Sequence, residues 1–378
     1  MSATSRFTVR VGAIGTIALL LMALSPARAD DDAGKGTGNE RPGKVSTAIA
    51  KGLGKIRLDG DMLALLKAHE GLKPKAIEKL DVRAARANPT LADAVQALLR
   101  RNQRSTDPAQ LAPGITSVDA TVQGAAGPLP ARFYTPAGPG PGPFPVVVYF
   151  HGGGWVLADK QVYDASARAI AQQAQALVIS VDYRRAPEAR FPAAWDDALA
   201  AYRWTLANAA NRKGDASRVA LAGESAGGNL ALATAIAARD AGLQKPAHVL
   251  AIYPLTQSSL NTESYLENAL AQPLNRAMVQ WFLDQLLEDK AQLKDWRLNL
   301  IDARLAGLPP VTLISARVDP LRSDSAKMED ALKRADVLVE RRDYEGVTHE
   351  FFGAAAVVEK ARNAQAFAGE RLRRAFGN

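Results

Sequence analysis

A serine between glycines is the first group in this sequence that could perform covalent chemistry. Gly223-Glu224-Ser225-Ala226-Gly227 follows an apolar run and precedes an alanine-rich stretch, which predicts a tight turn between a strand and a helix. Glycine two positions on either side of the serine removes side chains that would clash in such a turn. The turn would expose the Ser225 hydroxyl at the N-terminus of a helix, where developing negative charge is favoured. Ser225 is therefore a candidate nucleophile.

A glycine-rich loop could supply the hydrogen-bond donors that this chemistry needs. His151-Gly152-Gly153-Gly154-Trp155 follows another apolar run. Glycine N–H groups can approach a ligand closely, and acyl transfer requires such donors where the carbonyl oxygen becomes an oxyanion. We expect His151 and Gly152, at the start of the loop, to support it through a hydrogen bond. A role for His151 as the base is not favoured.

A serine nucleophile also needs a base and an acid, and the chain contains only four histidines. His69 falls in an N-terminal helical segment, where we expect it at the surface, and His248 opens a strand at the edge away from the chemistry. By elimination His349, which follows the last candidate strand, is the base. The acid is expected after the preceding strand, at Asp319. Its competitor Asp324 is favoured instead as a first-turn helix residue.

The elements that must position these residues form an alternating pattern. Apolar runs at 146–150, 177–181, 219–221, 249–252, 311–314 and 337–339 predict buried strands, after two alternating strands at 115–122 and 129–134. Helical stretches at 165–174, 192–209 and 230–239 lie between them. This pattern predicts an α/β protein whose mostly parallel sheet is covered on both faces. The C-terminal ends of the strands then share one edge, where ligands bind. Between Pro254 and Val311 we expect only helices.

The N-terminal part has a different organisation. Arg6 and Arg10, the apolar run 11–24 and the cleavage pattern Ala27-Arg28-Ala29 predict a signal peptide over residues 1–29. The run is shorter than the roughly 20 residues that span a membrane, so release is favoured over an uncleaved anchor. Residues 30–44 predict a disordered tether, 45–112 a helical cap segment, and 113–378 a catalytic domain with a helical insertion at about 255–305. The protein is thus expected to be exported, to the periplasm or the medium.

Composition narrows the class of function. The hydrophobic fraction of 47% and the charged fraction of 23% are ordinary for a globular protein. The net charge of +8 is spread thinly, without a basic block, so nucleic acid binding is not indicated. The absence of cysteine excludes disulfides, thiolate metal sites and a cysteine nucleophile. No stretch after the N-terminal run is apolar enough to predict stable membrane insertion.

Together these residues resemble the hormone-sensitive-lipase-like branch of the α/β-hydrolases, the bacterial esterases and acetyl esterases. The matching segments are HGGGW at 151–155, GESAGG at 223–228, DYRRAPE at 182–188 ahead of FPAA at 191–194, DPL at 319–321, and His349. Glu224 stands where aspartate is commonest in this branch. The resemblance covers residues from about Pro113 to the C-terminus. It implies an α/β-hydrolase fold with a twisted, mostly parallel sheet of about eight strands, helices on both faces and a helical cap.

The resemblance also implies a reaction. The N–H groups of Gly153, Gly154 and Ala226 would form the oxyanion hole of a serine carboxylesterase acting on small esters with short- to medium-chain acyl groups. No metal and no organic cofactor is expected, and a homodimer is left open. Trp281 and Phe282 could line the acyl pocket or merely pack between cap and sheet. The alternatives are a deacetylase, lipase or lactonase on a specialised ester, or a non-catalytic ligand sensor on the same fold.

Overall fold

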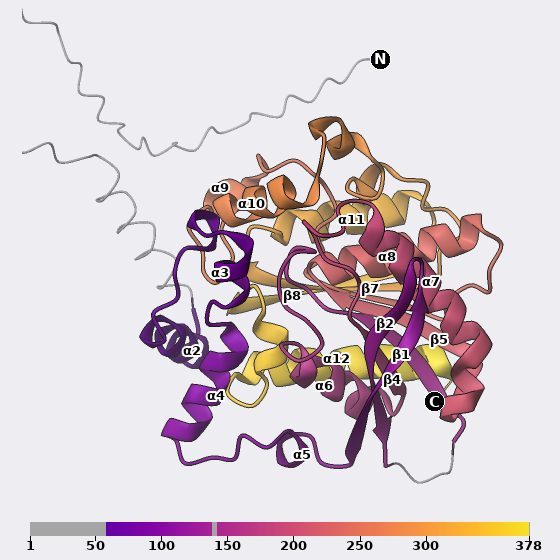
Figure 1. Ribbon diagram of the computed structural model, residues 1–378, viewed down its shortest axis with the longest axis horizontal. Helices are drawn as coiled ribbons and strands as arrows, with labels where there is room; N and C mark the ends of the chain where they lie inside the picture. Colours follow the sequence, from indigo (N-terminus) through magenta and orange to yellow (C-terminus); the bar gives the residue numbers. More distant parts are fainter. Residues whose placement is uncertain (1–57, 138–141, 378) are drawn as a thin grey trace, which may run out of the picture. The chain divides into compact units, whose positions relative to one another are not determined.

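A sheet of eight strands forms the centre of the molecule (Figure 1). The computed structural model describes residues 58–137 and 142–377; the predicted signal peptide and tether lie outside the described residues. The strands lie in the order β1-β2-β4-β3-β5-β6-β7-β8. β1 pairs with β2 and β2 with β4 in antiparallel fashion, and every later pair is parallel. The predicted α/β-hydrolase fold, with a mostly parallel sheet of about eight strands, is confirmed.

Six of the strands extend beyond the predicted apolar runs. Their bounds are β1 Ile115–Gly124, β2 Gly127–Pro136, β3 Phe144–Phe150, β4 Leu177–Val181, β5 Gly214–Glu224, β6 Val249–Ile252, β7 Val311–Val318 and β8 Val339–Thr348. The prediction of a short strand at 337–339 was wrong, because β8 begins at Val339 and continues for ten residues through a charged stretch. β8 is an edge strand, so charged side chains on it can reach solvent. Its last three residues are buried, and they lead directly to His349.

Helices cover both faces of the sheet. α6 (Asp164–Ala174) and α12 (Glu359–Phe376) pack together on one face. α7 (Ala193–Asn208), α8 (Ala226–Asp240) and α11 (Arg322–Arg334) contribute to the core on the other face. The residues of β3 alternate between these two cores and are buried on both sides. This double burial is the reason the parallel strands appear in the sequence as continuous apolar runs.

The N-terminal helical segment consists of short helices. They are α2 Gly60–Gly71, η1 Ile77–Lys79, α3 Val82–Arg86, α4 Leu91–Arg101 and α5 Pro108–Leu111. A capping box between Thr90 and Asp93 begins α4, because each side chain bonds the other residue's backbone N–H. Within residues 58–137 and 142–377, no helix is both long and apolar enough to cross a membrane.

The interval between β6 and β7 is also helical. It contains α9 Glu263–Glu267, α10 Arg276–Leu286, η3 Lys290–Lys294 and η4 Leu300–Asp302. These helices follow the C-terminal end of β6 and therefore lie at the edge of the sheet where Ser225 follows β5. α10 contacts η1 of the N-terminal segment, so the two helical segments meet each other. In Figure 1 α9 and α10 lie beside α3.

Candidate active site

Ser225 occupies a strained turn between β5 and α8. Its backbone has φ 56° and ψ −116°, in a region that residues with a side chain rarely adopt. Both flanking glycines are required, since a Cβ at Gly223 would lie 2.1 Å from the Gly227 oxygen and one at Gly227 would lie 2.0 Å from the Phe150 oxygen. The Ser225 N–H donates to the oxygen of Ile252 at 2.8 Å. Neighbouring backbone thus holds the predicted turn in place.

His349 and Asp319 form a buried pair at the ends of β8 and β7. His349 Nδ1 lies 2.8 Å from Asp319 Oδ2, and the two side chains are 3% and 0% exposed. The other carboxylate oxygen, Oδ1, accepts a hydrogen bond from the Leu321 N–H at 2.8 Å. Asn268, at the C-terminal end of α9, donates its side-chain amide to the Asp319 backbone oxygen at 3.2 Å. The helical insertion therefore supports the loop that carries the carboxylate.

The electrostatic environment of His349 favours its charged form. Burial lowers the pKa of this imidazole, but the Asp319 carboxylate raises it through charge and hydrogen bonding, with further contributions from Glu350 and Glu224. The net pKa lies above the ordinary value of 6.5. An imidazole in such surroundings accepts a proton more readily than a free histidine, which is the property that a general base needs.

Ser225 and His349 lie at the same edge of the sheet. Tyr253 links them, because it directly follows Ile252, the residue that accepts the Ser225 N–H, and its ring lies 4.4 Å from the His349 ring. Within the described part of the chain, Ser225 Oγ has no hydrogen-bond partner. Catalytic hydrogen bonds often tighten only when substrate binds. The structure therefore places the three residues predicted as nucleophile, base and acid at one edge of the sheet, with His349 and Asp319 in direct contact.

Three backbone N–H groups beside Ser225 are available to a ligand. Among residues 58–137 and 142–377, none of the N–H groups of Gly153, Gly154 and Ala226 donates to another protein atom. Gly153 and Gly154 have φ values of 96° and 60°, which favour glycine. Gly154, Ser225 and Ala226 line one cavity. These are the groups predicted for an oxyanion hole.

His151 lies beneath the glycine loop, as expected of a supporting residue. Its Nδ1 lies 2.8 Å from the Gly152 oxygen, and its ring stacks on Tyr183 with 4.3 Å between ring centres. Tyr183 donates its hydroxyl to the His151 oxygen at 2.9 Å. Burial lowers the pKa of His151, although Asp182 opposes this effect. A neutral imidazole donating from Nδ1 fits these contacts.

A narrow apolar cavity opens beside Ser225. It has a volume of about 10 Å³, close to the room that one water molecule needs. Its apolar walls come from the loop after β6, the helical insertion and the loop after β7: Leu255, Leu274, Val279, Phe282 and Leu321. The Phe282 ring packs on the α-carbon of Gly154, where a Cβ would lie 2.2 Å from it. Trp281 does not line this cavity; its indole N–H donates to the Leu80 oxygen at 3.2 Å.

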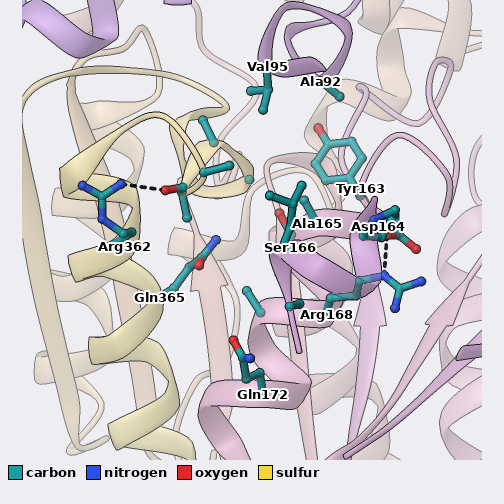
Figure 2. A pocket seen from close by; sticks show the side chains of 18 of the residues that line it. Ala92, Val95, Tyr163, Asp164, Ala165, Ser166, Arg168, Gln172, Arg362 and Gln365 are labelled. Carbon is teal, nitrogen blue, oxygen red and sulfur yellow. Dashed lines mark hydrogen bonds and ion pairs between the residues drawn. The ribbon is translucent and has the colours of Figure 1, made fainter. Parts of the chain in front are cut away.

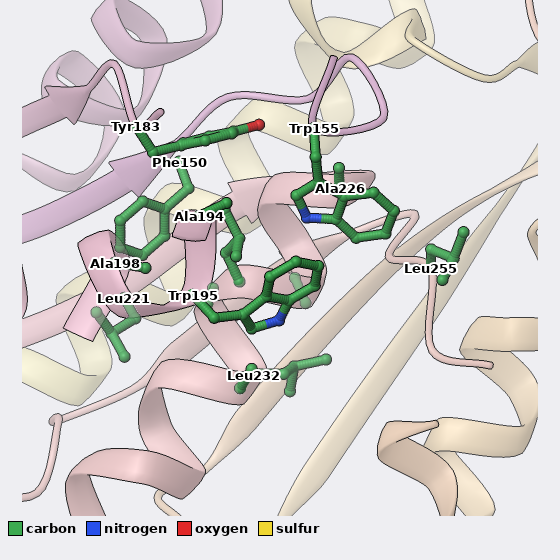
Figure 3. Packing of buried hydrophobic residues seen from close by; sticks show 14 of the residues in the cluster. Phe150, Trp155, Tyr183, Ala194, Trp195, Ala198, Leu221, Ala226, Leu232 and Leu255 are labelled. Carbon is green, nitrogen blue, oxygen red and sulfur yellow. The ribbon is translucent and has the colours of Figure 1, made fainter. Parts of the chain in front are cut away.

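Two tryptophans anchor the glycine loop, the predicted oxyanion loop, to the helices below it. Trp155, at the end of the loop, stacks on Trp195 of α7 with 5.1 Å between ring centres (Figure 3). The Trp195 indole N–H donates to Asn229 Oδ1 at 2.9 Å. Asn229, on α8, donates in turn to the oxygens of Leu255 and Arg297. Its amide therefore connects the nucleophile helix, the oxyanion loop and the apolar cavity.

The other candidates have structural contacts. Asp324 lies in the first turn of α11, as predicted, but it is fully buried and accepts hydrogen bonds from the N–H groups of Thr256 and Gln257. Burial raises the pKa of Asp324 to about 7. His248 Nε2 lies 2.9 Å from Thr312 Oγ1. His69 is half-buried, with Nε2 3.0 Å from the Pro89 oxygen, and keeps part of its surface exposed.

Two carboxylates next to the proposed catalytic residues were not predicted. Glu224 is buried and accepts hydrogen bonds from the hydroxyls of Tyr149, at 2.6 Å, and Tyr253. Burial raises the pKa of Glu224, although these hydrogen bonds oppose it. Glu350 follows His349 and has φ 63°, a left-handed conformation that favours glycine. Neither its backbone conformation nor its neighbours can be recognised from a glutamate in the sequence.

The sheet order and the serine turn define an α/β hydrolase, and comparisons identify the family. A family model described as the alpha/beta hydrolase fold matches residues 147–353. Carboxylesterase NlhH of Mycobacterium tuberculosis is 39% identical over 293 residues, which are 76% of this chain and 91% of that protein. Esterase LipI of the same organism is 37% identical over 279 residues, 72% and 86% of the two chains. The chain belongs to the hormone-sensitive-lipase-like branch of the α/β-hydrolase family.

Solved structures agree with this assignment. An esterase from Pyrobaculum calidifontis matches with a TM-score of 0.74 and 31% identity, covering 84% of this chain and 98% of that one. A thermostable esterase from Pseudomonas putida matches with a TM-score of 0.76 and 29% identity, covering 85% and 98%. The expected class of enzyme, a carboxylic ester hydrolase, is consistent with all four of these proteins.

Proposed function

We propose that this carboxylic ester hydrolase acts through a covalent acyl-enzyme on Ser225 and prefers short acyl groups. His349 takes the Ser225 proton while Oγ attacks the ester carbonyl carbon, and the three free N–H groups stabilise the oxyanion. His349 then gives that proton to the leaving alcohol oxygen. A water molecule, activated by the same imidazole, attacks the acyl-enzyme and releases the carboxylic acid and free Ser225. Asp319 holds the imidazole with Nδ1 protonated and stabilises its charged form.

The observation that carries this proposal is the position of the His349–Asp319 pair. The pair lies 2.8 Å apart at the edge where Ser225 occupies a strained turn. A structural histidine would not require a buried carboxylate on one side and a strained serine turn on the other. A non-catalytic ligand sensor is a less economical explanation, because a sensor does not need a nucleophile, a base and an acid, and this chain has candidates for all three.

The preference for short acyl groups is supported by the cavity beside Ser225. Its volume of about 10 Å³ has room for only a small apolar group. Phe282 bounds it on the side of the insertion and cannot approach Gly154 more closely. The methyl of an acetyl group is about the size of a water molecule and fits such a space with little rearrangement, whereas a longer chain requires the insertion to move.

Replacement of the nucleophile tests the proposal. Ser225→Ala should lower kcat for p-nitrophenyl acetate by at least about 10⁴-fold, because no other group can form the acyl-enzyme. A fluorophosphonate should label the unmodified protein and leave the variant unlabelled. Ser180→Ala is the matched control, since Ser180 is an equally buried serine on β4. Substantial turnover by purified Ser225→Ala, or labelling of that variant, would contradict the mechanism.

A further inference from the structure

A second and much larger cavity lies on the face of the sheet covered by α6 and α12. It has a volume of about 910 Å³, within the range of pockets that bind small molecules. α4 and α5 of the N-terminal segment, α6, the residues after His349 and α12 line it. In Figure 2 Arg362 and Gln365 of α12 lie across the hollow from Ser166 of α6, with Val95 of α4 at one end.

One end of this cavity lies beside the proposed catalytic centre, although Ser225 and His349 do not themselves line it. Glu224 and Glu350 line it, and they are the chain neighbours of the nucleophile and the base. Tyr163 lines the same end, and a Cβ at Gly152 of the oxyanion loop would lie 2.3 Å from its hydroxyl. A molecule in the cavity would therefore touch residues that also contact the nucleophile turn, the oxyanion loop and the base. The apolar cavity beside Ser225 has a separate set of walls.

Glu350 is the lining carboxylate with free hydrogen-bonding capacity. Asp164 is bound by Arg132 and Arg168, and Glu224 accepts the hydroxyls of two tyrosines. Glu350 is half-buried, and its one hydrogen bond is a long one, 3.4 Å, from the Tyr163 hydroxyl. Across the described ranges, no basic side chain forms an ion pair with it. A carboxylate held in left-handed backbone at the base of a cavity can still accept hydrogen bonds from a ligand.

The remaining walls favour neutral hydroxyl groups over a cation. Side-chain amides from three helices face the cavity, and apolar walls separate them: Gln96, Gln172 and Gln365, with Ala92, Val95 and Ala169. Amides donate and accept hydrogen bonds, as hydroxyl groups do. Arg104 and Arg362 are exposed lining residues, so their positive charge would oppose the binding of an ammonium group. Such a mixture of amide and apolar groups can hydrogen-bond the hydroxyl groups of a ligand and contact its carbon atoms.

We propose that this cavity receives the alcohol part of the substrate, that this alcohol carries several hydroxyl groups, and that Glu350 selects it. The proposal rests on the proposed esterase function. The acyl group would occupy the small cavity beside Ser225, and the alcohol would leave on the side of His349 and Glu350. No additional chemical step is required, because the leaving oxygen takes its proton from His349 as before. Glu350 acts as a specificity-determining residue at the alcohol side.

Pairs of acetyl esters that differ only in hydroxyl groups test this inference. Glucose 6-acetate is compared with tetrahydropyran-2-ylmethyl acetate, and glycerol 1-acetate with propyl acetate, by kcat/KM. The unmodified enzyme is compared with Glu350→Gly, which suits the left-handed backbone, and Glu350→Gln, which removes only the charge. Glu345→Gln is the matched control, since Glu345 is an exposed carboxylate on β8, five residues before Glu350, and does not line the cavity. p-Nitrophenyl acetate turnover and fluorophosphonate labelling test the esterase function independently.

The kcat/KM for the hydroxylated ester, divided by that for the ester without hydroxyl groups, should fall about tenfold in Glu350→Gly. This is the effect expected from the loss of one hydrogen bond to a charged group. The fall should be smaller in Glu350→Gln and absent in Glu345→Gln. If Glu350→Gly lowers kcat/KM for both esters equally, Glu350 supports only His349 and the inference is wrong. An unmodified enzyme that prefers acetylcholine to its neutral isostere 3,3-dimethylbutyl acetate would also overturn it, in favour of a cationic alcohol. If the unmodified enzyme does not turn over p-nitrophenyl acetate, the esterase function itself is refuted.

Discussion

The imidazole of His349 has carboxylates on more than one side. Asp319 bonds Nδ1 directly, and Glu350 and Glu224 contribute negative charge from further away. Each of these charges makes it easier for the ring to hold a proton. The free enzyme must lose that proton before His349 can act as a base. The pH at which activity appears therefore reports on the surroundings of this one ring.

The first prediction follows from the direction of this shift. Because the pKa of His349 lies above 6.5, kcat/KM should decline on acidification with a midpoint above that pH. Glu350→Gln removes one raising charge, so the midpoint should move to lower pH. The check is kcat/KM for p-nitrophenyl acetate between pH 5 and pH 9, with Glu345→Gln as the control. A midpoint that moves upward in Glu350→Gln would contradict the assignment.

The second prediction separates the two aspartates that the sequence offered as the acid. Asp319→Asn should lower kcat by about 10⁴-fold, because the imidazole loses the partner that fixes its tautomer. Asp324→Ala should instead destabilise the fold by about 3 kcal/mol, since the buried N–H groups of Thr256 and Gln257 lose their acceptor. Urea unfolding followed by circular dichroism measures the second effect. Full stability with lost activity in Asp324→Ala would reverse the roles.

Some individual residues of the site could be predicted from the sequence, and others could not. Ser225 was recognisable because its glycines, strand and helix are continuous in the sequence. His349 was recognisable because histidines are few and this one follows the last strand. Glu350 gave no signal, since its importance depends on a backbone angle of φ 63° and on a cavity built from α4, α6 and α12. Such a feature exists only after the helices have packed.

At the scale of elements, α10 sets the size of the acyl cavity. Val279 and Phe282 lie three residues apart on one face of this helix, and both line the cavity. Trp281 points elsewhere and bonds the Leu80 oxygen on the N-terminal segment. The helix therefore uses one face to limit the acyl group and another to hold the cap together.

The third prediction concerns the two faces of α10. Phe282→Ala should enlarge the cavity and raise kcat/KM for p-nitrophenyl hexanoate relative to the acetate by about tenfold or more, as each buried CH₂ contributes about 0.8 kcal/mol. Trp281→Phe is the control, because it removes the bond to Leu80 without touching the cavity. An unchanged chain-length profile in Phe282→Ala would show that another wall limits the acyl group.

β8 illustrates why element bounds were harder to predict than element types. Its middle residues are charged, and they were not assigned to a strand because the apolar pattern ends at Val339. An edge strand needs apolar residues only where it meets the core. Tyr344 and the last three residues of β8 do so, and they bring His349 to the active edge. The fully buried strands β4 and β6, by contrast, were predicted to the residue.

For the whole molecule, one arginine joins the N-terminal helices to the catalytic domain. Arg86, the last residue of α3, donates to the oxygens of Val156 and Ala186, each at 2.9 Å. Its two terminal nitrogens each donate to one carboxylate oxygen of Glu188, at 2.7 Å. Val156 directly follows the oxyanion loop. Arg86 is thus one of the groups that hold the N-terminal helices to the glycine loop.

The fourth prediction tests this connection. Arg86→Lys keeps the charge but cannot reproduce the two bonds to Glu188 and both carbonyl bonds, so the thermal midpoint should fall by about 3–6 °C. Glu188→Gln should have a much smaller effect, because the Glu188 side chain is largely exposed and surface ion pairs contribute little. Differential scanning calorimetry measures both. Equal shifts in the two variants would mean that the exposed bonds to Glu188, and not the carbonyl bonds, hold the cap.

Asn229 has a consequence for anyone who redesigns this enzyme. Its single amide accepts from Trp195 on one side and donates to the backbone of Leu255 and Arg297 on the other, so both of its N–H groups are in use. Libraries that vary Leu255, which lines the apolar cavity, will therefore also shift Trp195, on which the oxyanion loop packs. Combined substitutions at Leu255 and Trp195 should depart from additivity, and rounds of laboratory evolution would advance faster by varying the two positions together.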